Sequence, residues 1–225
     1  MSISFLSTRV GKCNEKDYGK LRRLVNYTHT TLDEESVIGI EDIGIMHTYV
    51  DASYAVQPNM RSHSGGEISY GIGLIASTSQ KQKLNVRSST EAEIVGVSDV
   101  LPKVLHIDLF LAAQGHPLKE NILYQDNKSA VKLEVNGKHS SSKRTRHVDI
   151  RYFYIKCLAD KEKILIKYCP TEKMIADFFT KPLQGNLFRV MRKIILGHKP
   201  LSYLNETIMT SSKERDRESE NERME

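Results

Sequence analysis

Alternating apolar and polar residues predict five β-strands. Residues 46–51 alternate in this way and lead into a turn of small residues, so that Asp51 closes the first strand. Residues 68–74 repeat the alternation and residues 74–80 are predicted to return as a third strand, whereas residues 61–66 are predicted to form a turn. Two further strands are predicted over 121–125 and 164–168.

Apolar residues at helical spacing predict helices around these strands. Residues 14–28 place Tyr18, Leu21, Leu24 and Val25 on one face, which we expect to be buried. The Ser88–Glu91 segment has the form of a capping box, so a helix should follow as far as Gly115, kinked or divided at Pro102. Further helices are predicted over 129–134, 140–158, 170–179 and 187–196.

The order of these elements indicates an α/β fold with a mixed sheet covered by helices. A right-handed crossover through the 88–115 helix can place the fourth strand parallel to the first. Asp51 and Asp126 would then lie at the same end of neighbouring strands. Glu93, in the first turn of the crossover helix, can point at that end, and Asp177 on the last predicted helix is a fourth candidate.

Four carboxylates at one place repel one another unless cations bind between them. A site of oxygen ligands suits Mg²⁺ or Mn²⁺. Two such ions about 3.5–4 Å apart can activate water and stabilise the leaving oxygen in phosphodiester hydrolysis. The acids therefore predict a two-metal phosphodiesterase, without a covalent protein intermediate.

All four candidates except Glu93 also have a simpler structural explanation. Asp51, at the end of a strand, could cap a turn or face water. Glu91 is better explained by the capping box than by metal binding. Asp126 could cap the short helix that follows it, and Asp177 could pair with Lys173 one turn earlier. Only the shared topology favours a joint role for the four acids.

Composition narrows the class of protein. The 225 residues suffice for one good core, and their charge of +5 suits a polyanionic partner. No apolar run reaches the length of a membrane helix, and the start lacks the pattern of a signal peptide. Three widely spaced cysteines without metal-site spacing favour a reduced intracellular protein, cytoplasmic or nuclear.

Five short motifs in a fixed order point to a known family. Together they closely resemble the ribonuclease H region of copia-type LTR-retrotransposon polyproteins, over about residues 46–185. The motifs are Tyr49-Val50-Asp51-Ala52, Ser88-Ser89-Thr90-Glu91-Ala92-Glu93, Tyr124-Gln125-Asp126-Asn127-Lys128-Ser129-Ala130, Thr145-Arg146-His147-Val148-Asp149-Ile150-Arg151-Tyr152 and Ala176-Asp177-Phe178-Phe179-Thr180-Lys181-Pro182-Leu183.

The resemblance implies a ribonuclease H-like fold with a five-stranded mixed sheet, three strands antiparallel and two parallel, flanked by helices. It implies an endonuclease that cuts RNA in RNA–DNA hybrids, with two Mg²⁺ or Mn²⁺ ions held by Asp51, Glu93, Asp126 and Asp177. Residues 45–185 would form this domain and 186–204 a helical extension, followed by a disordered tail over 205–225. Residues 1–44 look like a remnant of the reverse transcriptase C-terminus, which makes the reverse transcriptase portion a partner.

Basic and polar residues around these motifs are candidates for holding the hybrid through its phosphates. The candidates are Lys81, Lys83, Arg87, Asn127, Lys143, Arg144, Arg146, His147 and Arg151. A solvated helix face or a run that resembles a nuclear-import signal would explain the basic ones equally well. Many cellular ribonucleases H carry a histidine before the last acid. Here the loop before Asp177 has none, and His147 is a conceivable substitute.

Two other functions are compatible with the same motifs. The chain could be a non-catalytic hybrid-binding or connection module left from a truncated retroelement. It could also cleave DNA, as integrases and resolvases of the same fold do. Cleavage assays on hybrid and on duplex DNA separate the three.

Overall fold

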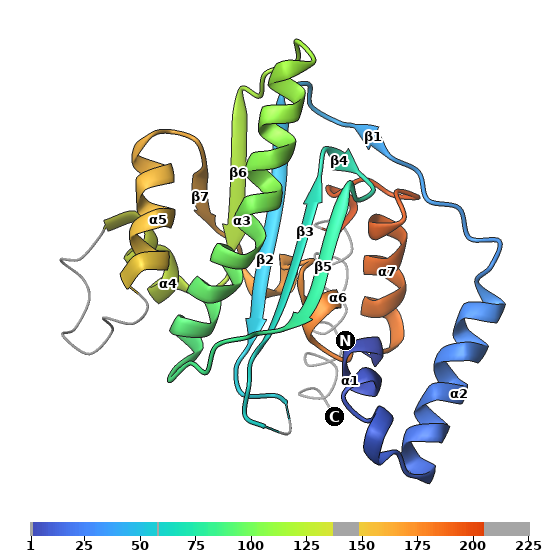
Figure 1. Ribbon diagram of the computed structural model, residues 1–225. Helices are drawn as coiled ribbons and strands as arrows, with labels where there is room; N and C mark the ends of the chain where they lie inside the picture. Colours follow the sequence, from blue (N-terminus) through green and yellow to red (C-terminus); the bar gives the residue numbers. More distant parts are fainter. Residues whose placement is uncertain (1, 58, 137–148, 205–225) are drawn as a thin grey trace, which may run out of the picture.

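The computed structural model describes residues 2–57, 59–136 and 149–204, and its centre is a five-stranded sheet (Figure 1). The strand order is β5-β3-β2-β6-β7. β3 pairs antiparallel with both β2 and β5, whereas β6 pairs parallel with both β2 and β7. The predicted mixed sheet is confirmed. Its strands are β2 (Ile45–Ser53), β3 (His63–Ser69), β5 (Ala76–Lys81), β6 (Glu120–Gln125) and β7 (Leu165–Tyr168).

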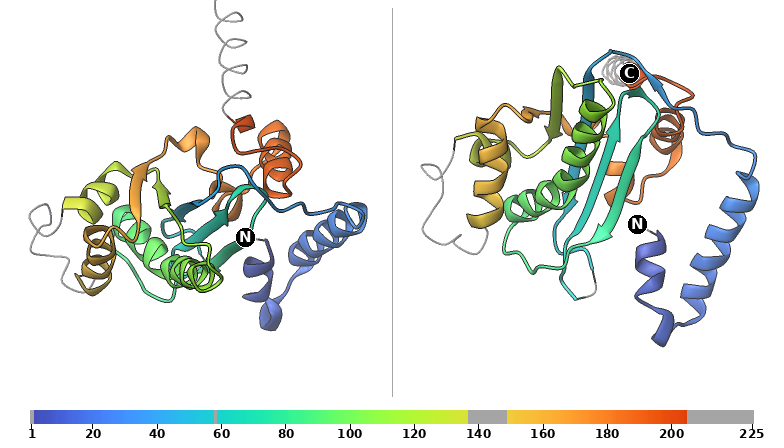
Figure 2. Two further views of the ribbon diagram at one scale, coloured as in Figure 1. Left: turned by 90° about the horizontal axis from the view of Figure 1, so that it is seen from above. Right: turned by 45° about the horizontal axis from the view of Figure 1, so that its top comes forward.

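Helices cover both faces of this sheet (Figures 1 and 2). α3 (Ser89–Ala113) lies on one face, where α4 (Lys128–Asn136) and α5 (Asp149–Asp160) pack against it and against each other. The short α6 (Asp177–Thr180) lies against β3 and β2 from the opposite face. There α7 (Gly185–Ile195) buries Val190, Met191 and Ile194 in a second apolar cluster, which Tyr49 of β2 joins.

β3 is buried on both faces, and two adjacent glycines allow it. A Cβ atom at Gly66 would lie 2.6 Å from Val100 Cγ2 of α3. A Cβ atom at Gly65 would lie 2.6 Å from Thr180 Cγ2 of α6. The prediction of a turn over 61–66 is therefore wrong beyond its first residues, since the strand begins at His63. The glycines indicate close helix packing rather than a turn.

α3 runs through Pro102 without a break, so of the two predicted effects of this proline, a kink or a division, the division is wrong. The proline ring is exposed, whereas Leu101 and Val104 beside it are fully buried. Burial of the apolar face holds the helix together despite the hydrogen bond that proline cannot make. The helix ends at Ala113, and Gly115 follows with φ of +84°, which is the predicted glycine stop.

The predicted helix over 170–179 is wrong as a single element. The structure has a short 3₁₀ helix, η3 (Thr171–Lys173), and then α6, separated by Met174 in an extended conformation. Met174, Ile175 and Ala176 are all completely buried. The extended backbone of Met174 ends the 3₁₀ helix, and the chain changes direction there before α6 begins.

The N-terminal segment contains α1 (Ser2–Ser7), a 3₁₀ turn η1 (Val10–Lys12) and α2 (Glu15–Thr30). α2 begins with a capping box between Asn14 and Asp17. Its predicted burial is wrong, because Tyr18, Leu21 and Val25 are exposed. The helix lies beside the sheet rather than over a face of it (Figures 1 and 2).

The chain before the sheet is tied to α7 and to the residues that follow it. Glu34 forms an ion pair of 3.0 Å with Arg192, and the Val37 amide donates to the Leu196 carbonyl at 2.8 Å. The two-residue strands β1 (Gly39–Ile40) and β4 (Gly71–Ile72) then form a small separate sheet. The proposed boundaries at 44/45 and 185/186 stay predictions. The predicted disordered tail, 205–225, lies outside the described residues.

Candidate metal-binding site

Three acidic side chains from three separate elements meet at one edge of the sheet. Asp51 lies near the end of β2, Glu93 in the first turns of α3, and Asp126 directly after β6. β2 and β6 are parallel neighbours, which places Asp51 and Asp126 at the same end. One carboxylate oxygen from each of the three residues lies within 4.8 Å of the others.

This cluster is electrostatically costly for the protein. Asp51 is 3% exposed and Glu93 is 4% exposed. Burial raises the pKa of Asp51, and Thr180 and Lys181 oppose that rise. The pKa of Glu93 is raised well above its usual value by burial, and further by the charges of Asp51 and Asp126. A bound cation would relieve this repulsion.

The donor set fits a hard divalent cation. All three residues offer carboxylate oxygens, which Mg²⁺ and Mn²⁺ prefer. Glu93 Oε2 is buried and has no hydrogen-bond partner among the described residues. A buried charged oxygen without a partner is unfavourable unless a further group, such as a metal ion, contacts it.

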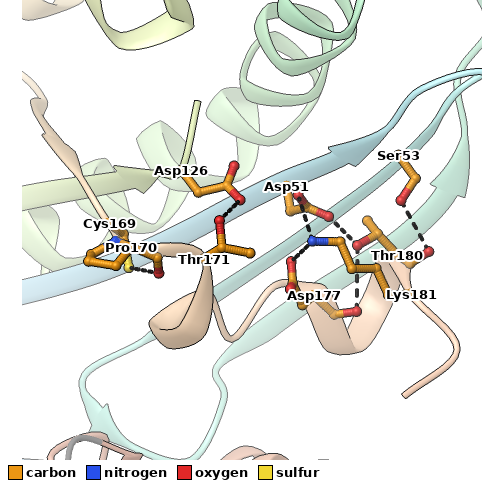
Figure 3. Close-up of polar contacts among 9 residues, drawn as sticks. All are labelled: Asp51, Ser53, Asp126, Cys169, Pro170, Thr171, Asp177, Thr180 and Lys181. Carbon is orange, nitrogen blue, oxygen red and sulfur yellow. Dashed lines mark hydrogen bonds and ion pairs between the residues drawn. The ribbon is translucent and has the colours of Figure 1, made fainter. Parts of the chain in front are cut away.

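Asp177 approaches the same site through a lysine (Figure 3). Lys181 Nζ lies 2.7 Å from Asp177 Oδ1 and 3.8 Å from Asp51 Oδ1. Burial raises the pKa of Asp177 to about 7, and the hydrogen bond from Lys181 opposes that rise. The predicted partner Lys173 is wrong, because Asp177 pairs with the residue one turn later rather than one turn earlier.

Neighbouring hydroxyl groups orient two of the acids. The Thr180 hydroxyl donates to Asp51 Oδ2, and the Thr171 hydroxyl donates to Asp126 Oδ2 at 2.9 Å (Figure 3). The structural alternative for Asp126 is wrong, because Asn127 caps α4: its Oδ1 accepts the backbone amides of Ser129 and Ala130. The Asp126 carboxylate therefore has no part in capping α4 and belongs to the acidic cluster.

Three of these contacts were not predicted. Thr171 and Thr180 follow no spacing rule that connects them to Asp126 and Asp51. Lys181 could have been found, because it lies four residues after Asp177, where an i,i+4 ion pair is expected on a helix. Ser88 caps α3, with its hydroxyl accepting the Glu91 amide at 3.2 Å, and the Glu91 carboxylate accepts the Arg87 amide before the helix.

The predicted nucleic-acid-binding residues fall into three groups. Lys81 ends β5, and the pairing of Ser53 with His63 and of His63 with Lys81 places it at the edge that carries the acids. Lys83 and Arg87 follow in the exposed loop before α3. Arg151 pairs with Asp99 of α3 at 2.8 Å and Asn127 caps α4, and a role of either residue in nucleic-acid binding stays a prediction. The remaining candidates, Lys143, Arg144, Arg146 and His147, lie outside the described residues.

A mixed sheet of this strand order, with acids meeting at the ends of two parallel neighbours, defines a ribonuclease H-like module. The sequence is 30% identical over 155 residues to a Pol polyprotein from transposon TNT 1-94 of Nicotiana tabacum. It is 28% identical over 190 residues to one from transposon RE2 of Arabidopsis thaliana. These matches cover 68% and 84% of this chain. The chain is thus homologous to retrotransposon Pol polyproteins, as the motifs predict.

The chain spans only 12–13% of the length of these relatives. No protein-family model matches the sequence. Among solved structures, LC11-RNase H1 from compost is similar, with a TM-score of 0.43 and 12% identity over 60% of this chain and 92% of that one. Prototype foamy virus protease-reverse transcriptase gives a TM-score of 0.38 and 15% identity over 72% of this chain and 22% of that one. In the described parts of the chain, no helix is long and apolar enough to cross a membrane.

Proposed function

We propose that this chain is the ribonuclease H module of a retrotransposon Pol polyprotein, and that it hydrolyses the RNA strand of RNA–DNA hybrids. The observation that carries the proposal is the convergence of Asp51, Glu93 and Asp126, with their oxygens within 4.8 Å of one another. Homology to Pol polyproteins supports the substrate class. The reverse transcriptase portion of such a polyprotein would supply the hybrid.

The acids of this chain would hold Mg²⁺ or Mn²⁺. Asp51, Glu93 and Asp126 form one set of ligands, and Asp177 is joined to Asp51 through Lys181. When bound, divalent ions lower the pKa of a water and stabilise charge on the leaving oxygen of the phosphodiester. The sheet fixes Asp51 and Asp126, while Thr180 and Thr171 orient their carboxylates. No side chain has to form a covalent bond with the substrate.

Basic residues at the same edge would contact the hybrid. Lys81 lies two strands from Asp51, about 10 Å across the sheet at the usual strand spacing. With Lys83 and Arg87 it can contact phosphates beside the cleaved one. Such contacts provide affinity that falls with salt and little choice of sequence, so hybrids would be distinguished by groove shape and 2′-hydroxyl groups.

The direct test is cleavage of a labelled RNA–DNA hybrid with Mg²⁺ by the full chain and by Asp126→Asn. We expect the wild-type chain to cut only the RNA strand, and the variant to lose cleavage while it still binds the hybrid. Glu120→Gln, an exposed acid at the other end of β6, is the matched control and should cleave as the wild type does.

Each other outcome points to a different function. Binding of the hybrid without cleavage by either protein would make the chain a non-catalytic binding module. Cleavage of duplex DNA in preference to the hybrid would place it with the DNA-cutting enzymes of this fold. Cleavage that persists in Asp126→Asn would contradict the assigned site.

A further inference from the structure

Lys181 places its positive charge between two carboxylates of the candidate metal site. Its ammonium lies 2.7 Å from Asp177 Oδ1 and 3.8 Å from Asp51 Oδ1, and is therefore between the two carboxylates (Figure 3). Both acids are more than nine-tenths buried, whereas the Lys181 side chain is 37% exposed. The Lys181 ammonium group thus reaches the site from the solvent side.

The geometry separates the four predicted ligands into two sets. Asp51, Glu93 and Asp126 converge on one another, and Asp177 is absent from that cluster among the described residues. Asp177 contacts the lysine instead, through the i,i+4 relationship within and just after α6. Asp51 belongs to both sets, since its Oδ1 also faces Lys181.

An ammonium and a divalent cation cannot both lie against the same carboxylate oxygen at low cost. At about 4 Å their repulsion is about 2 kcal/mol even in water, and more where solvent is excluded. A metal ion between Asp51 and Asp177 would therefore have to displace Lys181 Nζ. The partial exposure of the lysine leaves room for that movement, since a long side chain can turn its charge toward water.

We propose that Lys181 competes with a divalent ion for the Asp177 carboxylate, so that the site has one tight and one weak cation position. This inference rests on the proposed function, in which the acids bind divalent ions. The tight position is formed by Asp51, Glu93 and Asp126, and it shares Asp51 with the weak one. The weak position lies between Asp51 and Asp177 and fills only when Lys181 moves out.

The number of divalent ions at the wild-type site should therefore depend on the metal concentration. At low metal concentration Lys181 neutralises part of the charge of Asp51 and Asp177, and the site holds a single ion. At higher concentration the second ion replaces the lysine. Cleavage that depends on two ions would then require metal concentrations set by the weak position, and Lys181 would control that threshold.

The experiment counts bound ions directly, with Mn²⁺ as the probe and the full chain as the protein. Mn²⁺ titrations followed by calorimetry and by electron paramagnetic resonance are compared between wild type and Lys181→Met. We expect one tight and one weak ion in the wild type. In Lys181→Met the dissociation constant of the weak ion should fall at least about tenfold, with the tight ion little changed.

Two variants control for charge and for the loss of an ion pair. Lys181→Arg keeps the positive charge and should retain the weak second ion. Lys156→Met removes a lysine that pairs with Asp160 at 2.7 Å and the same i,i+4 spacing on α5, a helix that carries none of the four candidate acids. It should bind Mn²⁺ as the wild type does. In an Asp177→Asn background, Lys181→Met should no longer change the second ion.

The outcomes separate this inference from the proposed function. If no variant binds Mn²⁺ tightly, the metal site itself is wrong. If the tight ion binds but Lys181→Met leaves the second ion unchanged, only the competition is wrong. Thermal unfolding verifies that each variant is folded, and Lys181→Gln provides a second neutral replacement if Lys181→Met is not.

Discussion

The Thr171 hydroxyl donates a hydrogen bond of 2.9 Å to Asp126 Oδ2, although the two residues are 45 positions apart. The bond joins the 3₁₀ helix after β7 to the end of β6. Asp126 has no capping duty, because Asn127 accepts the first amides of α4. The hydrogen bond from Thr171 therefore restricts the rotation of the Asp126 carboxylate.

We predict that Thr171→Val lowers hybrid cleavage and metal affinity by about tenfold, the usual effect of losing a partner that orients a ligand. Because Thr171 is exposed, the free energy of unfolding should change by less than about 0.5 kcal/mol. Thr171→Ser keeps the hydroxyl and should behave as the wild type. Steady-state kinetics and urea unfolding measure both effects, and equal activity of all three proteins would contradict the orienting role.

We expect the Glu93 carboxylate to be required for cleavage and to lower the stability of the folded protein. Its buried carboxylate lies beside two other acids and one of its oxygens has no partner in the described part of the chain. Glu93→Gln removes the charge, so we expect cleavage to be lost while the free energy of unfolding at neutral pH rises by about 1 kcal/mol or more. Chemical unfolding and cleavage are measured on the same preparation.

Glu91→Gln is the matched control for this trade-off, because Glu91 lies two residues away on the same helix. Its carboxylate accepts the Arg87 amide, and a glutamine oxygen can still accept that bond. We expect cleavage to be retained and the protein to be slightly less stable, the opposite of Glu93→Gln. A destabilised Glu93→Gln would show that the acids are not under electrostatic strain.

Four of the five strands could be predicted, because alternating polarity is a local pattern, whereas the strand expected over 68–74 is β3, which begins at His63 and ends at Ser69. The acids could be selected because each lies near a strand end or a helix start. The parallel pairing of β2 with β6, which places Asp51 beside Asp126, followed from a general rule about crossovers. Lys181 was not assigned to the site for a different reason. The i,i+4 spacing indicates its ion pair with Asp177, but its approach to Asp51 depends on the packing of α6 against β2 and β3, which no local pattern describes.

Burial was the weakest part of the sequence-based prediction. The apolar spacing of α2 is real, yet Tyr18, Leu21 and Val25 are exposed, since amphipathic spacing does not specify what covers a face. In β3 burial was underestimated rather than overestimated. Polar and glycine residues from His63 to Ser69 are all buried, because two helices approach its glycines closely from both sides.

The approach of α3 to β3 predicts a strong effect of one methyl group. Gly66→Ala would place a Cβ atom 2.6 Å from Val100 Cγ2, so helix and strand must separate. We expect a loss of about 1–3 kcal/mol in the free energy of unfolding, as for other overpacked cores. Combining it with Val100→Ala, which vacates the space, should recover part of that loss in urea unfolding.

Gly19→Ala provides the matched comparison. Gly19 lies inside α2, where a Cβ atom would meet nothing within 4 Å. Alanine is favoured over glycine in a helix by about 0.5–1 kcal/mol, so this variant should be as stable as the wild type or slightly more stable. If both alanine variants behaved alike, the close contact of Gly66 with Val100 would not be present in solution.

The last prediction concerns pH and the buried Glu134 of α4. Neither of its carboxylate oxygens has a hydrogen-bond partner among the residues described, and burial raises its pKa to about 8. In the unfolded chain the group ionises near its ordinary value of 4.5, so between these two values only the folded state retains the proton. The free energy of unfolding should therefore fall by up to about 1.4 kcal/mol per pH unit over this window and become level above it.

Glu134→Gln isolates this effect from the other buried acids, whose raised pKa values act in the same direction. The glutamine is neutral at every pH, so the variant should gain stability over the wild type as pH rises from about 5 to about 8, with little difference below. The exposed Glu172→Gln should follow the wild-type profile. Urea unfolding across this range measures the difference. Parallel profiles for wild type and Glu134→Gln would show that Glu134 is ionised in the folded protein, with a partner such as water or a cation beside it.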